Sequence, residues 1–129
     1  MTQNVLITGI TGFVGSHLAD LVLEKGFTVY GLKRWHLSKM RNVRGIVDKI
    51  NWIDCDITDP ISVKNALKTC NPDKIFHLAA ESFVSPSWDH PSHYMDVNYK
   101  GTVNILESMR ELDMKSRILI PGSGEEYGE

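Results

Sequence analysis

The chain has 129 residues, of which 42% are hydrophobic and 23% are charged, and its formal net charge is −2. This length and composition are typical of one globular domain, and the charge argues against nucleic acid or an anionic membrane as a partner. No apolar run reaches the roughly 20 residues of a membrane span, and the N-terminus lacks a secretory signal pattern. We therefore expect a cytoplasmic protein with one domain over residues 1–129.

Short apolar strands alternate with helical segments along the chain. Strands are predicted at Val5–Thr8, Thr28–Leu32, Ile50–Asp54, Lys74–Leu78 and Arg117–Ile120. Helices are predicted from Phe13 to about Lys25, from Pro60 to the Asn71-Pro72 pair, and from about Pro91 to Leu112. The segment Lys33–Lys49 is basic and irregular, with at most a short helix. Right-handed crossovers then give an α/β fold, a Rossmann-type doubly wound parallel sheet of order 3-2-1-4-5 that stops after the fifth strand.

Three glycines stand three residues apart where the first strand becomes the first helix. In the dinucleotide-binding motif, Gly9 makes the tight turn, Gly12 lets the backbone approach a phosphate, and Gly15 lets the helix pack on the strand. The pyrophosphate then sits on the helix N-terminus. The alternative is that the glycines only bend the chain. Their position after the first strand of an α/β pattern favours the nucleotide.

The end of the second strand indicates which dinucleotide binds. Where NAD-binding proteins place an acid for the ribose, this chain has Lys33 and Arg34, and no carboxylate follows until Asp48. A guanidinium binds a 2′-phosphate through paired, charge-assisted hydrogen bonds. We therefore expect NADP, with Arg34 as the main contact and Lys33 in support, and NAD as the other possibility. The alternative is a basic loop that is merely solvated.

The end of the third strand carries a second candidate contact. Asp56 is positioned to accept a hydrogen bond from the adenine amine, with Ile57 covering the ring. Alternatively, Asp56 caps the following helix, which is the role we expect for Asp59.

Three further side chains are expected to have structural roles. Cys55 and Cys70 are too few for a metal site and do not indicate a disulfide, so we expect them in the core and predict no metal. His77 stands among apolar strand residues and is expected to be hydrogen-bonded rather than a catalytic base.

Several motifs together resemble one family. They are Gly9-Ile10-Thr11-Gly12-Phe13-Val14-Gly15, Asp56-Ile57, His77-Leu78-Ala79-Ala80, Asn98-Tyr99-Lys100-Gly101-Thr102 and Gly122-Ser123-Gly124-Glu125-Glu126-Tyr127-Gly128. The sequence resembles the extended short-chain dehydrogenase/reductases that act on nucleotide sugars. Lys33-Arg34 and the run from Ala80 to Ser85 are most similar to the GDP-mannose 4,6-dehydratases and the GDP-4-keto-6-deoxymannose reductases.

The resemblance implies a role for each matching residue. It implies that the pyrophosphate is held by Gly9, Thr11, Gly12, Phe13, Val14 and Gly15, the 2′-phosphate by Arg34 with Lys33, and the adenine by Asp56 and Ile57. It further implies that Leu78, Ala79 and Ala80 line the path to the nicotinamide, that Ser82 faces the ribose or the sugar, and that Asn98 helps to order the active site.

The closing segment carries the implied catalytic residues. By resemblance, Ser123 hydrogen-bonds the keto or hydroxyl oxygen of the sugar, and Glu125 removes a proton next to the keto group. Many sugar dehydratases have an acidic residue at the position of Gly124. The sequence of the closing segment is more similar to that of the reductases. The alternative is a solvated acidic turn.

The family's proton donor is a Tyr followed four residues later by a Lys, and no such pair occurs in the 129 residues. We therefore expect the cofactor half of a nucleotide-sugar lyase or oxidoreductase, without its sugar-binding domain and inactive alone. The resemblance also implies a homodimer that pairs through the long helix. The alternatives are a non-catalytic dinucleotide-binding module and a fragment of another nucleotide-sugar epimerase or dehydratase.

Overall fold

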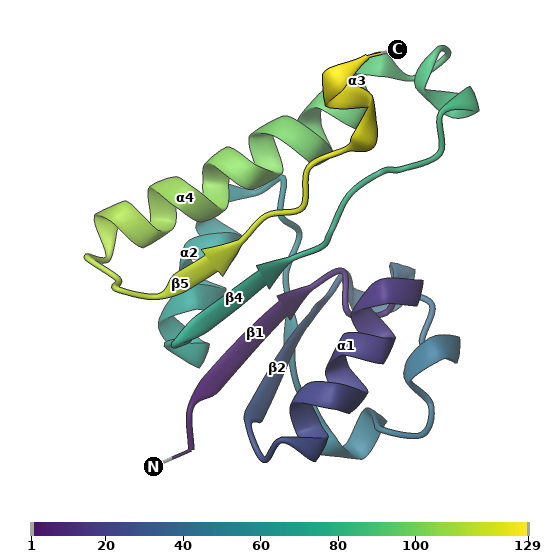
Figure 1. The fold of residues 1–129 in the computed structure, drawn as a ribbon. Helices are drawn as coiled ribbons and strands as arrows, with labels where there is room; N and C mark the ends of the chain where they lie inside the picture. Colours follow the sequence, from purple (N-terminus) through teal and green to yellow (C-terminus); the bar gives the residue numbers. More distant parts are fainter. Residues whose placement is uncertain (1, 129) are drawn as a thin grey trace.

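The computed structural model describes residues 2–128, which form one five-stranded parallel sheet (Figure 1). The strands are β1 (Asn4–Thr8), β2 (Thr28–Lys33), β3 (Asn51–Asp54), β4 (Lys74–His77) and β5 (Arg117–Leu119). Their order is β3-β2-β1-β4-β5, which confirms the predicted topology. Every strand begins and ends within one residue of its predicted position.

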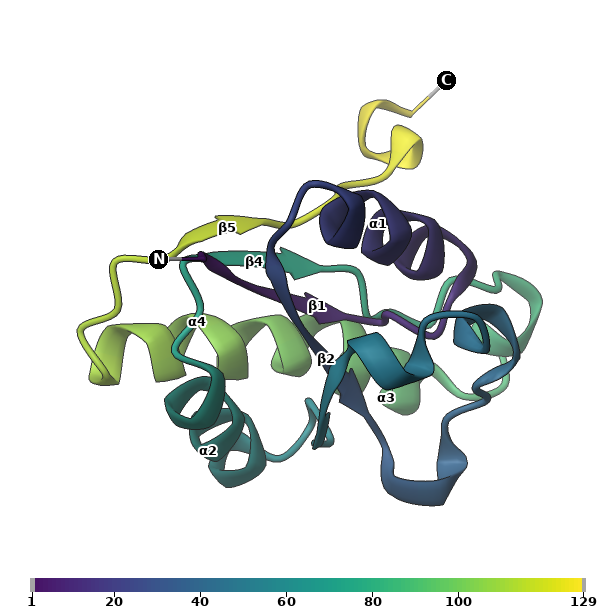
Figure 2. The same ribbon diagram turned by 90° about the horizontal axis from the view of Figure 1, so that it is seen from below.

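Helices cover both faces of the sheet. They are α1 (Phe13–Glu24), α2 (Pro60–Cys70), α3 (Pro91–Tyr94) and α4 (Gly101–Glu111). Figure 2 shows α1 on one face and α2 and α4 on the other. The segment between β2 and β3 contains three short 3₁₀ turns, at Trp35–Leu37, Arg41–Val43 and Val47–Lys49, in line with the irregular structure predicted there. Within residues 2–128, no helix combines the length and the apolar composition that crossing a bilayer requires.

Alternate residues of β1 build two separate cores. Val5 and Ile7 pack with Ala19 and Val22 of α1, whereas Leu6 packs on the opposite face with residues of α2 and α4. A strand that is buried on both faces needs an apolar residue at every position, which is why this part of the sequence does not alternate with polar residues. Cys55 and Cys70 are free thiols in the core on the α2 side, as predicted.

The ends of α2 follow from local sequence. Oδ1 of Asp59 accepts hydrogen bonds from the backbone N–H groups of Ile61 at 2.8 Å and Ser62 at 3.2 Å, and Pro60 occupies the first helical position. Asn71 ends the helix in the left-handed conformation, with φ 38°. The expected cap and stop are both confirmed.

The long helix predicted from Pro91 is continuous but not uniform. The π-helical turn Met95–Lys100 joins α3 to α4. Such turns insert one extra residue into a helix and occur often at functional sites. Gly101, where the turn ends, lets the helix approach Ile57 closely, because a Cβ there would lie 2.7 Å from Cδ1 of Ile57.

One part of the sheet is left uncovered in residues 2–128. On the face that carries α1, Phe76 of β4 is half-buried, and its neighbour in register, Leu119 of β5, is half-exposed. Helix α1 lies over β1 and β2 rather than over this pair (Figure 2). The half of the sheet formed by β4 and β5 therefore has a helical layer on one face only.

Candidate functional site

A pocket of about 630 Å³ lies at the carboxyl ends of β1, β2, β3 and β4. This is where open α/β sheets bind ligands, because the chain leaves neighbouring strands in opposite directions there. Ten of the residues predicted to bind the cofactor line it: Gly9, Thr11, Gly12, Lys33, Arg34, Asp56, Ile57, Leu78, Ala79 and Ala80.

The glycine turn has the geometry that a phosphate-binding turn requires. Gly9 has φ +67°, and a Cβ there would lie 2.7 Å from the backbone of Leu78. At Gly12 a Cβ would meet only the Gly9 carbonyl oxygen, at 3.1 Å, so the backbone is open toward the pocket. At Gly15 a Cβ would clash with that same oxygen and lie 2.7 Å from Cα of Ile10. Gly9 and Gly15 leave no room for a side chain, Gly12 leaves the backbone open, and the turn fits a pyrophosphate.

The first turn of α1 supplies hydrogen-bond donors beside the glycine turn. Gly12 is the N-cap residue and cannot offer a side chain to the free N–H groups of the helix. The first turn contains no acidic residue either, so the positive end of the 12-residue helix is not neutralised by the chain itself. An anion beside Gly12 would accept hydrogen bonds from these N–H groups.

A basic wall closes the pocket on the β2 side. Lys33, Arg34, Lys39 and Arg41 all line it. Nζ of Lys33 lies 2.7 Å from Oδ1 of Asp54, so this ammonium group is already paired. Arg34 has no ion-pair partner within residues 2–128.

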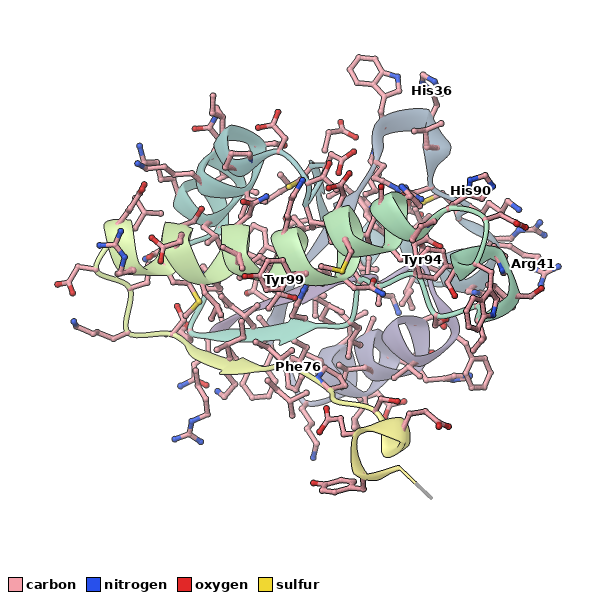
Figure 3. All side chains as sticks on the ribbon, turned by 90° about the horizontal axis from the view of Figure 1, so that it is seen from above. His36, Arg41, Phe76, His90, Tyr94 and Tyr99 are labelled. Carbon is pink, nitrogen blue, oxygen red and sulfur yellow. The ribbon has the colours of Figure 1, made fainter. Side chains whose placement is uncertain are left out.

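A side-chain hydrogen bond holds this basic segment against the glycine turn. Nδ2 of Asn42 donates to the backbone carbonyl of Thr11 at 3.0 Å. Val43, next to it, is fully buried and anchors the segment in the protein. Figure 3 shows Arg41 at the same end of the molecule as His90 and Tyr94, where the strands end.

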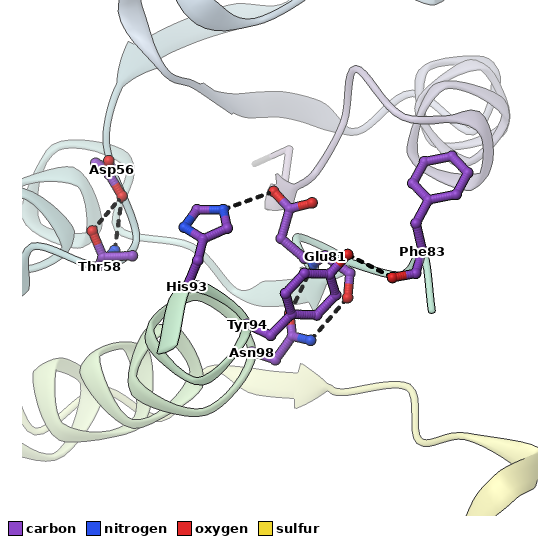
Figure 4. Close-up of polar contacts among 7 residues, drawn as sticks. All are labelled: Asp56, Thr58, Glu81, Phe83, His93, Tyr94 and Asn98. Carbon is purple, nitrogen blue, oxygen red and sulfur yellow. Dashed lines mark hydrogen bonds and ion pairs between the residues drawn. The ribbon is translucent and has the colours of Figure 1, made fainter. Parts of the chain in front are cut away.

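One carboxylate oxygen of Asp56 is hydrogen-bonded within its own turn. Its Oδ1 accepts hydrogen bonds from the backbone N–H of Thr58 at 2.9 Å and from the Thr58 hydroxyl at 2.8 Å (Figure 4). Asp59, not Asp56, caps α2. Asp56 thus lines the pocket with a carboxylate whose orientation is fixed by Thr58.

His77 is buried at the end of β4 and is hydrogen-bonded on both ring nitrogens, as predicted. Nδ1 lies 2.8 Å from the Thr8 hydroxyl, and Nε2 lies 3.0 Å from the Thr102 hydroxyl. Burial lowers the pKa of the imidazole. The ring joins β1, β4 and α4 beneath the pocket.

The loop after β4 is clamped by residues of α3 and the π-helical turn (Figure 4). The side-chain amide of Asn98 bonds to both backbone groups of Glu81: Oδ1 accepts its N–H at 2.8 Å, and Nδ2 donates to its carbonyl at 2.9 Å. The Tyr94 hydroxyl donates to the Phe83 carbonyl. Nε2 of His93 lies 3.4 Å from Oε1 of Glu81. Asn98 therefore acts on the loop, not on the pocket directly.

The remaining predicted site residues do not line the pocket. Phe13, Val14 and Ser82 are exposed beside it, and Gly15 is buried behind the turn. Ser123 caps the closing 3₁₀ turn Gly124–Tyr127, with its hydroxyl accepting the N–H of Glu125 at 3.2 Å. Glu125 is exposed. The structure does not bring these two residues to the pocket wall.

Sequence reasoning missed several pocket residues. They are Thr8, Leu32, Leu37, Ser38, Lys39, Arg41, Asn42, Cys55, Glu81, Phe83 and Val97. Thr8 carried a signal, since it is the last residue of the first strand. The residues of the irregular segment after β2 gave no such indication, because their sequence has no periodicity from which a position in the fold could be predicted.

A sequence model of the GDP-mannose 4,6 dehydratase family matches residues 6–129. This chain belongs to that family. The chain is 35% identical to the GDP-mannose 4,6-dehydratase of Yersinia enterocolitica, over 98% of its own length. The alignment covers 37% of that relative.

Solved structures show the same fold. The UDP-glucose 4-epimerase of Thermus thermophilus in complex with NAD is 31% identical, with a TM-score of 0.75 over 86% of this chain. The Brucella ovis UDP-glucose 4-epimerase in complex with NAD is 26% identical, with a TM-score of 0.86 over 99%. This member of the GDP-mannose 4,6 dehydratase family spans only 35% and 38% of those two chains, and it corresponds to the N-terminal part of its relatives.

Proposed function

We propose that residues 1–129 are the NADP-binding domain of an enzyme that modifies a nucleotide sugar. The observation that carries the proposal is the glycine turn, where Gly9 and Gly12 line the pocket and Gly15 packs behind them against Gly9 and Ile10. A nicotinamide dinucleotide bound there would accept or return a hydride. The chain's own part is to bind its phosphates on Gly12 and the α1 N-terminus, and to orient its two halves over β2 and β4.

The charges at the end of β2 support NADP over NAD as the preferred cofactor. Asp54 neutralises Lys33, which leaves Arg34 to meet a 2′-phosphate, with Lys39 and Arg41 on the same wall. An acidic residue at the end of β2 would repel that phosphate, and β2 contains no acidic residue. The solved relatives named above contain NAD, so the preference is a property proposed for this chain.

The family supports a substrate of the GDP-mannose class, either GDP-mannose or its 4-keto-6-deoxy derivative. In this proposal, Ser123 hydrogen-bonds a sugar oxygen and Glu125 takes a proton next to the keto group, once the closing segment is drawn toward the pocket. We further propose that the protein works in the cytoplasm as a homodimer.

Titration calorimetry of the chain with NADP and with NAD tests the cofactor proposal. We expect NADP to bind more tightly, and we expect no turnover of GDP-mannose by residues 1–129 alone. Equal affinities, or tighter binding of NAD, would contradict the proposed preference. Absence of binding to both dinucleotides would contradict the proposed function as a whole.

A further inference from the structure

The charges that line the pocket are divided between its two ends. Lys33 ends β2 and the other three cationic residues come from the segment that follows it, whereas Glu81 lies beyond β4. Asp56, the other acid that lines the pocket in residues 2–128, lies after β3 and is turned onto Thr58. Glu81 is therefore the negative charge at the β4 end.

The position of Glu81 is fixed mainly through its backbone, and only one oxygen of its carboxylate has a partner. Asn98 bonds to both its N–H and its carbonyl, which holds the residue at the end of the β4 loop. The side chain is 31% exposed, and its contact with His93 at 3.4 Å uses Oε1. In the described residues no group bonds to Oε2, so one carboxylate oxygen of this pocket-lining residue has no partner in the protein.

The orientation of a bound dinucleotide follows from what lies at the β2 end and at the β4 end of the pocket. The residue that follows β2 in such folds contacts the adenosine ribose, and the phosphates lie on the glycine turn. The nicotinamide half then extends past β4, along Leu78, Ala79 and Ala80 toward Glu81. This step rests on the function proposed above.

We infer that Glu81 makes the pocket prefer the oxidised dinucleotide. The oxidised nicotinamide ring carries a positive charge and the reduced ring is neutral, whereas the phosphates and the adenosine are the same in both forms. A carboxylate near the ring therefore attracts one form more than the other, and a partly water-excluded pocket screens this attraction less than bulk water does. Glu81 sets the redox preference of the site without taking part in the transfer.

The test compares Kd values for NADP⁺ and NADPH by titration calorimetry, in the chain and in its Glu81→Gln variant. The amide keeps the shape of the side chain and leaves the two Asn98 bonds to the backbone intact. We expect Kd for NADP⁺ to rise by about 5-fold or more, the order of magnitude of one interaction between unit charges, while Kd for NADPH stays the same. Glu24→Gln is the matched control, since it removes the same charge from an exposed position at the far end of α1.

The possible results separate the inference from the proposed function. Equal changes of both Kd values in Glu81→Gln, or no change in either, would overturn the inference while dinucleotide binding by the original chain stands. If the original chain binds neither form, the proposed function falls, and the inference falls with it. A thermal melt of the variant without ligand shows whether it is folded.

Discussion

The hydroxyl of Thr8 lies 2.8 Å from Nδ1 of His77 and joins β1 to β4 at the floor of the pocket. The neighbouring bonds determine where the protons are. The N–H of Ala79 donates to the Thr8 oxygen at 3.0 Å, and the Thr102 hydroxyl donates to the carbonyl of Asn98 at 2.9 Å. The Thr102 oxygen must then accept a hydrogen bond from Nε2–H of His77. Nδ1 of His77 is left to accept a hydrogen bond from the Thr8 hydroxyl. This assignment from the network makes His77 neutral.

The neutral His77 predicts a loss of stability in mild acid. Its pKa in the folded protein lies below the ordinary value of 6.5, because burial disfavours the charged ring. As the pH falls below about 6.5, the unfolded chain binds a proton that the folded chain does not, so the free energy of unfolding decreases until the folded pKa is reached. We expect urea midpoints to fall between pH 7 and pH 5, and His77→Gln to show a smaller fall. An equal fall in the variant would contradict this role.

Gly12 and Gly15 should respond differently to substitution. Gly12→Val adds a side chain on the open side of the turn, so we expect it to abolish NADP binding with little change in thermal stability. Gly15→Ala forces a methyl group against Gly9 and Ile10, so we expect it to cost about 1–3 kcal/mol of stability. Thermal melts with and without NADP measure both effects. A normal upward shift with NADP in Gly12→Val would show that the phosphates lie elsewhere.

Arg34 is expected to carry the preference for the 2′-phosphate. Arg34→Ala should weaken NADP binding by about 1–3 kcal/mol and leave NAD binding nearly unchanged, because only NADP presents the phosphate. Arg44→Ala serves as the control, since Arg44 is an exposed arginine of the same segment that does not line the pocket. If both variants weaken NADP binding equally, general attraction by the basic segment is the cause, and Arg34 has no specific contact.

Asn42 is expected to affect binding through the position of the basic segment. Asn42→Ala removes the bond to the Thr11 carbonyl, so the segment is no longer tied to the glycine turn. We expect weaker binding of NADP with little loss of stability, because the amide is exposed. Asn51→Ala removes a bond of the same kind, to the Val29 carbonyl, outside the pocket. Unchanged NADP affinity in Asn42→Ala would show that the segment holds its place without this bond.

The sequence carried the sheet order and the glycine turn because both depend on local patterns. Gly9, Gly12 and Gly15 are spaced by the turn itself, and each strand has an apolar centre within its own short segment. The pocket wall depends instead on contacts between distant residues. Asn42 reaches Thr11 across 31 positions, and Asn98 reaches Glu81 across 17. No spacing in the sequence records such pairs, so the bond that ties the basic segment to the glycine turn and the clamped loop emerged only from the structure.

Exposed apolar residues on the π-helical turn and α4 lead us to expect that the chain self-associates. Met95, Tyr99, Val103 and Leu106 follow one another at helical spacing and are 56%, 61%, 38% and 41% exposed. An apolar stripe of this kind on a helix is typical of a surface that pairs with another. We expect light scattering to show a dimer of the chain, and Val103→Glu to shift it toward monomer while its thermal melt stays close to the original. Asn65→Glu on α2 is the control for added charge. A chain that stays monomeric at high concentration would refute pairing through this stripe.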